Sequence, residues 1–112
     1  MKYIIAIIQP HKLEAVKQAL EDVEVHLITV SNVLGRGRQK GFTEVYRGSK
    51  EVGLLKKVKV EIAVNEDFLE PAIGAIEESC RTGKPGDGKI FVFDLAQCVR
   101  INTGERGSVA IG

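Results

Sequence analysis

The chain has 112 residues, 44% of them hydrophobic, and its 16 Lys and Arg nearly balance its 15 Asp and Glu at a net charge of +1. This length predicts a single domain, and the near-neutral charge gives no general attraction to nucleic acid. Cys80 and Cys98 have no metal-ligand spacing and are too few for a disulfide framework. Met1 leads directly into a strand-like run, and no apolar run is long enough to span a membrane. We therefore expect a cytoplasmic protein without membrane insertion.

The first part of the chain predicts a strand, a helix and a second strand. The isoleucine-rich run at residues 3–8 suits a central strand buried on both faces, and Pro10 marks a break after which a helix can start. Apolar residues then recur at spacings of three and four, as on one helical face: Leu13, Val16, Ala19, Leu20 and Val23. Residues 26–33 are rich in β-branched side chains and predict the second strand.

A similar unit follows a long loop. Residues 58–64 alternate between apolar and other side chains, which predicts a strand. Asn65 is a suitable N-cap for a helix, but Pro71 removes a hydrogen bond, so we expect an irregular start until about Glu70. Gly83 is placed to end this helix. Residues 90–95 predict a strand, residues 99–101 a final extended piece, and residues 102–112 a polar tail.

This order predicts an α+β fold of the ferredoxin-like βαββαβ type with an antiparallel sheet. Both helices must cover one face of the sheet. The other face is then bare, although the strands offer apolar side chains to both sides. We therefore expect the bare face to be buried by self-association.

Two glycine-rich runs interrupt this pattern. Residues 35–48 contain four glycines and four cations, and residues 82–89 read TGKPGDGK. Glycine allows positive φ and close approach of the backbone to a ligand. Successive amides in such turns bind anions, and Lys or Arg completes the match. The runs predict phosphate binding, although a solvated basic loop and ordinary turn glycines are the simpler alternatives.

The runs GRGRQKGFTEVYRG, KVKVEIAV, TGKPGDGKIFVF and RINTGER together resemble the PII signal-transduction protein family of the GlnB/GlnK type. The resemblance covers essentially the whole chain. It implies one PII domain at residues 1–112, with a long target-contacting T-loop at about 36–55 and a C-terminal tail at about 102–112. It also implies a homotrimer with ATP or ADP bound in clefts between subunits.

The resemblance implies a nucleotide-binding set made up of Ile7, Thr29, Gly35, Gly37, Arg38, Ala63, Gly86, Asp87, Gly88, Lys89, Arg100 and Asn102. In the family, the loop at residues 86–89 wraps the phosphates, and Arg100 reaches across from the neighbouring subunit. Ala63 lies on a strand that lines the base. Taken alone, Asp87 is equally well explained as a turn residue that bonds its own backbone.

The resemblance also implies a 2-oxoglutarate site formed by Gln39, Lys40, Gly41 and Lys57. Gln39 would ligate Mg²⁺ together with the nucleotide phosphates, because an amide oxygen suits this hard cation. Lys57 would neutralise a carboxylate of the keto-acid. Lys57 could instead be a solvated charge at a strand edge.

Four features depart from the family pattern, and one of them is Phe42 in place of a common histidine. The stretch from residue 48 to residue 57 is one residue shorter. Glu51 stands where some members carry a tyrosine that is uridylylated, and Tyr46 is the only loop tyrosine, so we expect no such modification. Asn102 replaces an arginine, which removes one positive charge from the phosphate end.

We expect a non-enzymatic sensor that regulates a target such as an ammonium transporter or the glutamine synthetase system. The alternative is a PII-like adenylate sensor that does not use 2-oxoglutarate and serves another transporter or pathway. A small hydrolase on the same fold is a third possibility, because fold alone does not set function. His11 and His26 are isolated, however, and no nucleophile–base pair stands out.

Overall fold

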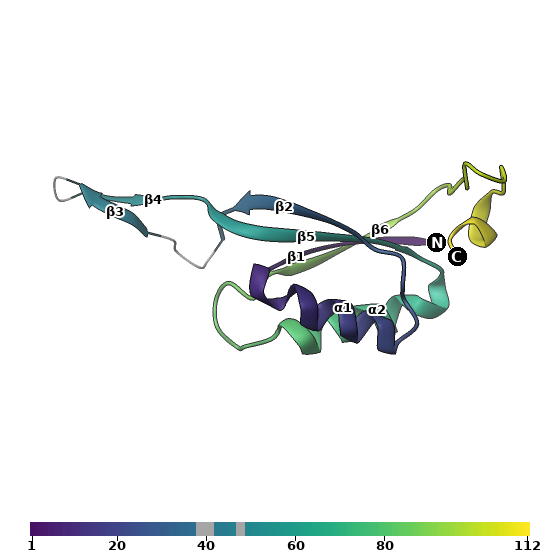
Figure 1. The fold of residues 1–112 in the computed structure, drawn as a ribbon, viewed down its shortest axis with the longest axis horizontal. Helices are drawn as coiled ribbons and strands as arrows, with labels where there is room; N and C mark the ends of the chain where they lie inside the picture. Colours follow the sequence, from purple (N-terminus) through teal and green to yellow (C-terminus); the bar gives the residue numbers. More distant parts are fainter. Residues whose placement is uncertain (38–41, 47–48) are drawn as a thin grey trace.

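The computed structural model describes residues 1–37, 42–46 and 49–112. Its elements in chain order are β1 (Lys2–Ile8), the short 3-10 helix η1 (Pro10–Lys12), α1 (Leu13–Asp22), β2 (Thr29–Gly35), β3 (Phe42–Tyr46), β4 (Ser49–Val52), β5 (Leu55–Val64), α2 (Glu66–Cys80), β6 (Lys89–Asp94) and the 3-10 helix η2 (Gly107–Ala110). Four strands pair antiparallel in the order β2-β5-β1-β6. Both helices cover one face of this sheet (Figure 1). The predicted ferredoxin-like α+β fold is confirmed.

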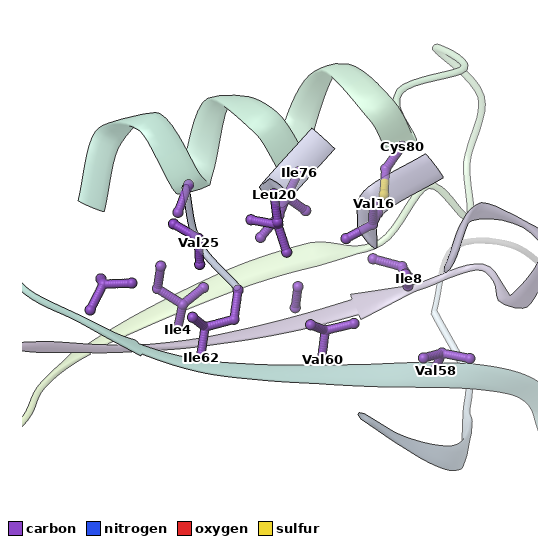
Figure 2. Close-up of a cluster of buried hydrophobic side chains, with 13 residues drawn as sticks. Ile4, Ile8, Val16, Leu20, Val25, Val58, Val60, Ile62, Ile76 and Cys80 are labelled. Carbon is purple, nitrogen blue, oxygen red and sulfur yellow. The ribbon is translucent and has the colours of Figure 1, made fainter. Parts of the chain in front are cut away.

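The core lies between the sheet and the two helices. Alternate residues of β1 and β5 point toward the helices and are buried, among them Ile4, Ile8 and Ile62. Val16 and Leu20 of α1 and Ile76 of α2 meet them from the helical side (Figure 2). The helix spacing of three and four and the strand spacing of two therefore place these side chains in one apolar layer, as the sequence pattern predicts.

The long loop contains a hairpin that the sequence did not predict. Strands β3 and β4 pair antiparallel, and they project beyond the main sheet (Figure 1). The loop is therefore not entirely irregular. The sequence of the loop is polar and charged and lacks clean apolar alternation, so it did not indicate this pairing.

Strand β2 begins at Thr29 rather than at residue 26. The preceding connection turns at Glu24, whose φ is 63°, and then inserts Val25 into the core at 6% exposure. The residues before Thr29 thus form the connection from α1 in the helix layer to β2 in the sheet. The sequence pattern alone does not show where such a connection ends and the strand begins.

Helix α2 starts at Glu66 and continues through Pro71, so the predicted irregular start is wrong. The amide of Phe68 donates to the carbonyl of Asn65 at 3.0 Å and closes the first turn. An interior proline costs roughly 3 kcal/mol. Burial of Ile76 contributes about 1.5–3 kcal/mol, and together with the smaller buried side chains of Ala72 and Cys80 it offsets this cost.

Gly83 does not cap helix α2, contrary to the prediction. The helix ends at Cys80, and Arg81 already has extended backbone angles. Gly83 has a φ of 83° and belongs to the loop beyond. The glycine therefore shapes that loop rather than the helix end.

The face of the sheet away from the helices is open and apolar. Tyr3 pairs with Phe93 and Ile5 pairs with Phe91, so these side chains share that face. Phe91 and Phe93 are 45% and 51% exposed. The hydroxyl of Tyr3 donates to Glu61 on the same face at 3.0 Å. The predicted bare apolar face is present in the single chain.

Both chain ends lie beside the start of helix α2. The amino group of Met1 lies 3.8 Å from Glu66 Oε1, and the side-chain amide of Asn65 donates to the Ser108 carbonyl at 3.0 Å. Figure 1 shows the two termini at one end of the sheet and the β3–β4 hairpin at the other. Over the described part of the chain, no helix combines the length and apolarity needed to cross a membrane.

Candidate functional site

A cavity of about 620 Å³ lies where the loop between α2 and β6 meets the ends of β1, β2 and β5. It gathers residues from both glycine-rich runs: Ile7, Gly35, Arg36, Gly37, Lys57, Lys84, Pro85, Gly86, Asp87, Gly88, Lys89 and Phe91. Four of these are cations and one is an acid. The cavity is therefore an electropositive recess of a size typical of small-molecule sites.

Gly88 is the residue that lets the loop close against the sheet. Its φ is 108°, and a Cβ atom added there would lie 1.9 Å from the carbonyl oxygen of Ile7. Gly86 also has a positive φ, of 104°. A side chain at position 88 would both strain the backbone and push the loop off β1. The wall of the cavity thus requires glycine at this point.

The carboxylate of Asp87 holds the loop together from within. It accepts hydrogen bonds from the Thr82 hydroxyl, from the Thr82 amide at 2.7 Å and from the Gly83 amide at 3.0 Å. The side-chain bond from Thr82, followed by its backbone bond, holds the pKa of Asp87 below its ordinary value. The Asp87 side chain thus bonds its own loop, as the turn-residue alternative describes, and it also lines the cavity.

Lys57 connects the base of the long loop to the glycine loop. Its side chain is buried at 9% exposure, and its Nζ donates a long hydrogen bond of 3.5 Å to the Gly86 carbonyl. Lys57 is therefore not a solvated charge at a strand edge. It lines the cavity, where its positive charge faces the same space as that of Lys89.

A second group of cations lies at the far end of the sheet, in the segment after β6. Arg100 Nη1 donates to Glu105 Oε1 at 2.6 Å, and Nη2 donates to the Val109 carbonyl at 3.1 Å. Val99 and Arg106 form an isolated antiparallel bridge, which is the expected extended piece at residues 99–101 in a shorter form. Strand β6 begins at the cavity with Lys89 and leads away to this segment (Figure 1).

Comparison with known proteins assigns the chain to a family. The family described as "Nitrogen regulatory protein P-II" matches residues 1–105. The chain belongs to the P-II family. It is 50% identical to nitrogen regulatory protein GlnK1 of Methanosarcina mazei, over 99% of this chain and 97% of that protein. It is 51% identical to nitrogen regulatory protein P-II 1 of Escherichia coli, over 99% of this chain and 100% of that protein. A P-II protein of Rhodospirillum rubrum is 50% identical over 99% of this chain and 100% of its own length.

Membership of the P-II family confirms the identification made from the glycine-rich motifs. It also establishes the coarse role, that of a nitrogen-regulatory protein. The residues predicted to bind ligands separate into three groups in the structure.

The first group lines one cavity and consists of Ile7, Gly35, Gly37, Lys57, Gly86, Asp87, Gly88 and Lys89. The second group does not line it. Thr29 pairs with Glu61 and Ala63 pairs with Tyr3, both farther along the sheet, while Arg100 and Asn102 lie beyond β6. The third group, Arg38, Gln39, Lys40 and Gly41, lies outside the described residues.

The cavity also contains residues that the P-II resemblance did not supply. Arg36 and Lys84 are cations inside the two glycine-rich runs, and Phe91 faces the open side of the sheet next to Lys89. The local excess of positive charge around residues 35–59 was a signal for Arg36. Lys84 could have been found from its place beside Gly83 and Pro85.

Among the residues that the structure describes, no group of three His, Cys, Asp or Glu side chains is placed to hold a metal ion. The Mg²⁺ expectation rests on Gln39, which lies outside those residues. The described cavity does fit a polyphosphate, because glycine backbone and lysine side chains line it. Any cation accompanying the phosphates would take its oxygen ligands mainly from the bound ligands themselves.

Proposed function

We propose that this P-II protein is a non-enzymatic sensor that binds ATP or ADP between subunits of a homotrimer. The proposal extends to 2-oxoglutarate bound with Mg²⁺ and ATP, and to control of a nitrogen-metabolism target such as an ammonium transporter or the glutamine synthetase system. The observation that carries it is the cavity of about 620 Å³, in which two glycine-rich runs and four cations meet. Backbone amides and lysines in such a recess suit a polyphosphate.

An inter-subunit site accounts for the separation of the predicted residues. Lys89 lines the cavity at the start of β6, whereas Arg100 lies in the segment beyond the other end of that strand and does not line it, so one chain does not bring both to one ligand. A second copy docked on the open apolar face can bring its own Arg100 to the cavity. Burial of Phe91 and Phe93 would favour that association.

Ligands would act on the target by changing the conformations available to the long loop. Lys57 supports this coupling, because it joins the base of that loop to Gly86 in the cavity wall. A ligand that draws Lys57 toward its own carboxylate would change this connection. It can shift the loop only as far as its affinities for the alternative conformers differ.

Isothermal titration calorimetry on the full chain tests the proposal. ATP and ADP are titrated with and without Mg²⁺ and 2-oxoglutarate, using wild type, Lys89→Ala and Arg100→Ala. Loss of a charge-assisted phosphate contact should cost about 1.5–3 kcal/mol of binding free energy in each variant. Lys17→Ala is the control, because Lys17 is an exposed cation on α1 paired with Glu14 at 3.2 Å. Unchanged ATP binding in both test variants would contradict the site.

The same titrations separate the second candidate function. A PII-like adenylate sensor would bind nucleotides but show no heat with 2-oxoglutarate in the presence of Mg²⁺ and ATP. The buried position of Lys57 in the cavity favours the first candidate, since a buried cation there suits a carboxylate ligand. Lys57→Ala should therefore remove 2-oxoglutarate binding and leave most of the ATP affinity.

A further inference from the structure

The segment after β6 pairs its key cation with its own acid. Arg100 Nη1 donates to Glu105 Oε1 at 2.6 Å, and the Thr103 hydroxyl donates to the same oxygen at 2.8 Å. Glu105 is the only acid between residues 98 and 112. The positive charge of Arg100 is therefore matched by the one negative side chain of this segment.

The backbone holds these two residues together without help from their side chains. The Arg100 amide donates to the Glu105 carbonyl at 2.9 Å, and the Gly104 amide donates to the Arg100 carbonyl at 2.7 Å. The Gly107 amide donates to the Cys98 carbonyl at 2.9 Å. A change of the Glu105 side chain thus removes charge while the loop that carries Arg100 keeps its closure.

The ion pair is open to competition from a larger anion. The side chains of Arg100 and Glu105 are 34% and 43% exposed. Ion pairs at this level of exposure are weak, because water and salt screen them. A guanidinium has five N–H groups, so a phosphate can share Arg100 with Glu105, but two anions then share one positive charge.

We propose that Glu105 is an internal competitor that lowers the affinity of the phosphate site for its ligand by occupying Arg100. The inference rests on the proposed function, because it requires Arg100 of one subunit to meet the nucleotide phosphates in the next. Glu105 does not touch the ligand in this proposal. It acts through Arg100, because its negative charge offsets the positive charge that would attract the phosphates. The penalty is larger for ATP than for ADP, because the longer phosphate chain carries more negative charge near the carboxylate.

Glu105→Gln isolates the charge. The glutamine oxygen still accepts from Arg100 and Thr103, so the loop geometry is preserved while the negative charge is lost. Calorimetry on the full chain should show a dissociation constant for ATP lower by about two- to fivefold, with a smaller change for ADP. The gain should shrink as salt is raised from 50 to about 500 mM, because screening weakens the removed repulsion.

The control is Glu14→Gln, which removes one negative charge from an exposed acid on α1 that pairs with Lys17 at 3.2 Å. This variant should bind ATP like wild type. A double variant tests whether Glu105 acts through Arg100. When Glu105→Gln is added to the Arg100→Gln variant, ATP affinity should not change. A role of Glu105 in loop structure alone predicts weaker binding in both backgrounds.

The outcomes separate this inference from the proposed function. Wild type that binds ATP, with Glu105→Gln equal or weaker, overturns the competitor role and leaves the nucleotide site standing. A gain that persists in Arg100→Gln also overturns it, because the carboxylate then acts without Arg100. Wild type that binds neither ATP nor ADP overturns the proposed function and this inference together.

Discussion

The loop at residues 82–88 and the segment at residues 98–110 each contain a single carboxylate, and the two use it in opposite ways. Asp87 binds a hydroxyl and two amides of its own loop, all neutral donors. Glu105 binds the guanidinium of Arg100. The Asp87 carboxylate shapes its loop by binding neutral donors, whereas the Glu105 carboxylate offsets the positive charge of Arg100 beside it. Counting charges in a sequence would treat the two segments alike.

The two segments also differ in what keeps their glycines in place. Gly88 packs against the Ile7 carbonyl, whereas Gly104 and Gly107 have nothing within 4 Å of an added Cβ atom. All three have positive φ. The cavity loop therefore has a glycine fixed by contact with the sheet in addition to the hydrogen bonds of Asp87, whereas the glycines of the C-terminal segment have no such contact. Four predictions test this contrast and the assembly that would unite the two segments.

Placing a charge on the open apolar face of the sheet should have the largest effect on assembly and ATP binding. Phe93→Asp places a charge among the apolar side chains of that face, which a docked copy would desolvate at a cost of several kcal/mol. We expect wild type to be a trimer by light scattering and Phe93→Asp to be a monomer without high-affinity ATP binding. Leu27→Asp, at an exposed apolar residue before β2, is the control and should remain trimeric. A wild-type protein that is a compact monomer at micromolar concentration would contradict this prediction.

Glycine replacements compare the two segments directly. Gly88→Ala combines a positive φ with a clash against Ile7, so it should lower the free energy of unfolding by about 2–4 kcal/mol and impair ATP binding. Gly104→Ala meets only the backbone strain, about 1–2 kcal/mol. Urea denaturation measures both. Gly74→Ala in α2 has open space around it and should be neutral or stabilising by up to about 1 kcal/mol. An equal loss of unfolding free energy in Gly88→Ala and Gly104→Ala would contradict the proposed difference between the two segments.

Asn102→Arg should sharpen the role of the C-terminal segment. It adds a second cation near Arg100, and a charge-assisted contact to the γ-phosphate is worth up to about 1.5–3 kcal/mol, less where water intervenes. We expect ATP affinity to rise more than ADP affinity in calorimetry. Gln18→Arg adds the same charge on α1 and should change neither. Equal gains for the two nucleotides would show that residue 102 does not face the γ-phosphate.

The smallest expected effect is a loss of order in the cavity loop when acidic pH protonates Asp87. The pKa of Asp87 is lowered in the folded chain, so its contribution to loop order is present above its unfolded pKa and is lost as pH falls through its folded pKa. The window therefore lies below about pH 4. Amide hydrogen exchange should show protection at Thr82 and Gly83 falling in that window for wild type, while Asp87→Asn shows no such step. A wild-type step above pH 5 would contradict this assignment.

Most of the fold could be predicted because its elements have clear periods. Val58, Val60 and Ile62 alternate along a half-buried strand, and Val16 and Leu20 recur at helical spacing. Element ends were less predictable. They depend on contacts that no local pattern encodes, such as the insertion of Val25 into the core and the packing that keeps α2 helical through Pro71.

The candidate site was predictable where glycine and charge coincide in the sequence. Gly86, Gly88 and Lys89 line the cavity as the run around them indicated. The internal bonds of Asp87 and the pairing of Arg100 with Glu105 depend on how each turn folds, so the residue types alone did not reveal which acid binds which donor. The contributions of Arg36 and Lys84 arise from the approach of two loops far apart in the chain.

The position of the chain ends offers an engineering route. Met1 and Ser108 both contact the start of α2, and this end of the sheet is remote from the hairpin (Figure 1). In the proposed assembly, flexible linkers from the end of one copy to the start of the next would make one tandem polypeptide. A single substitution could then be introduced into one copy only. Such a molecule would report whether signal strength follows the number of intact copies of the proposed site or requires every copy to respond.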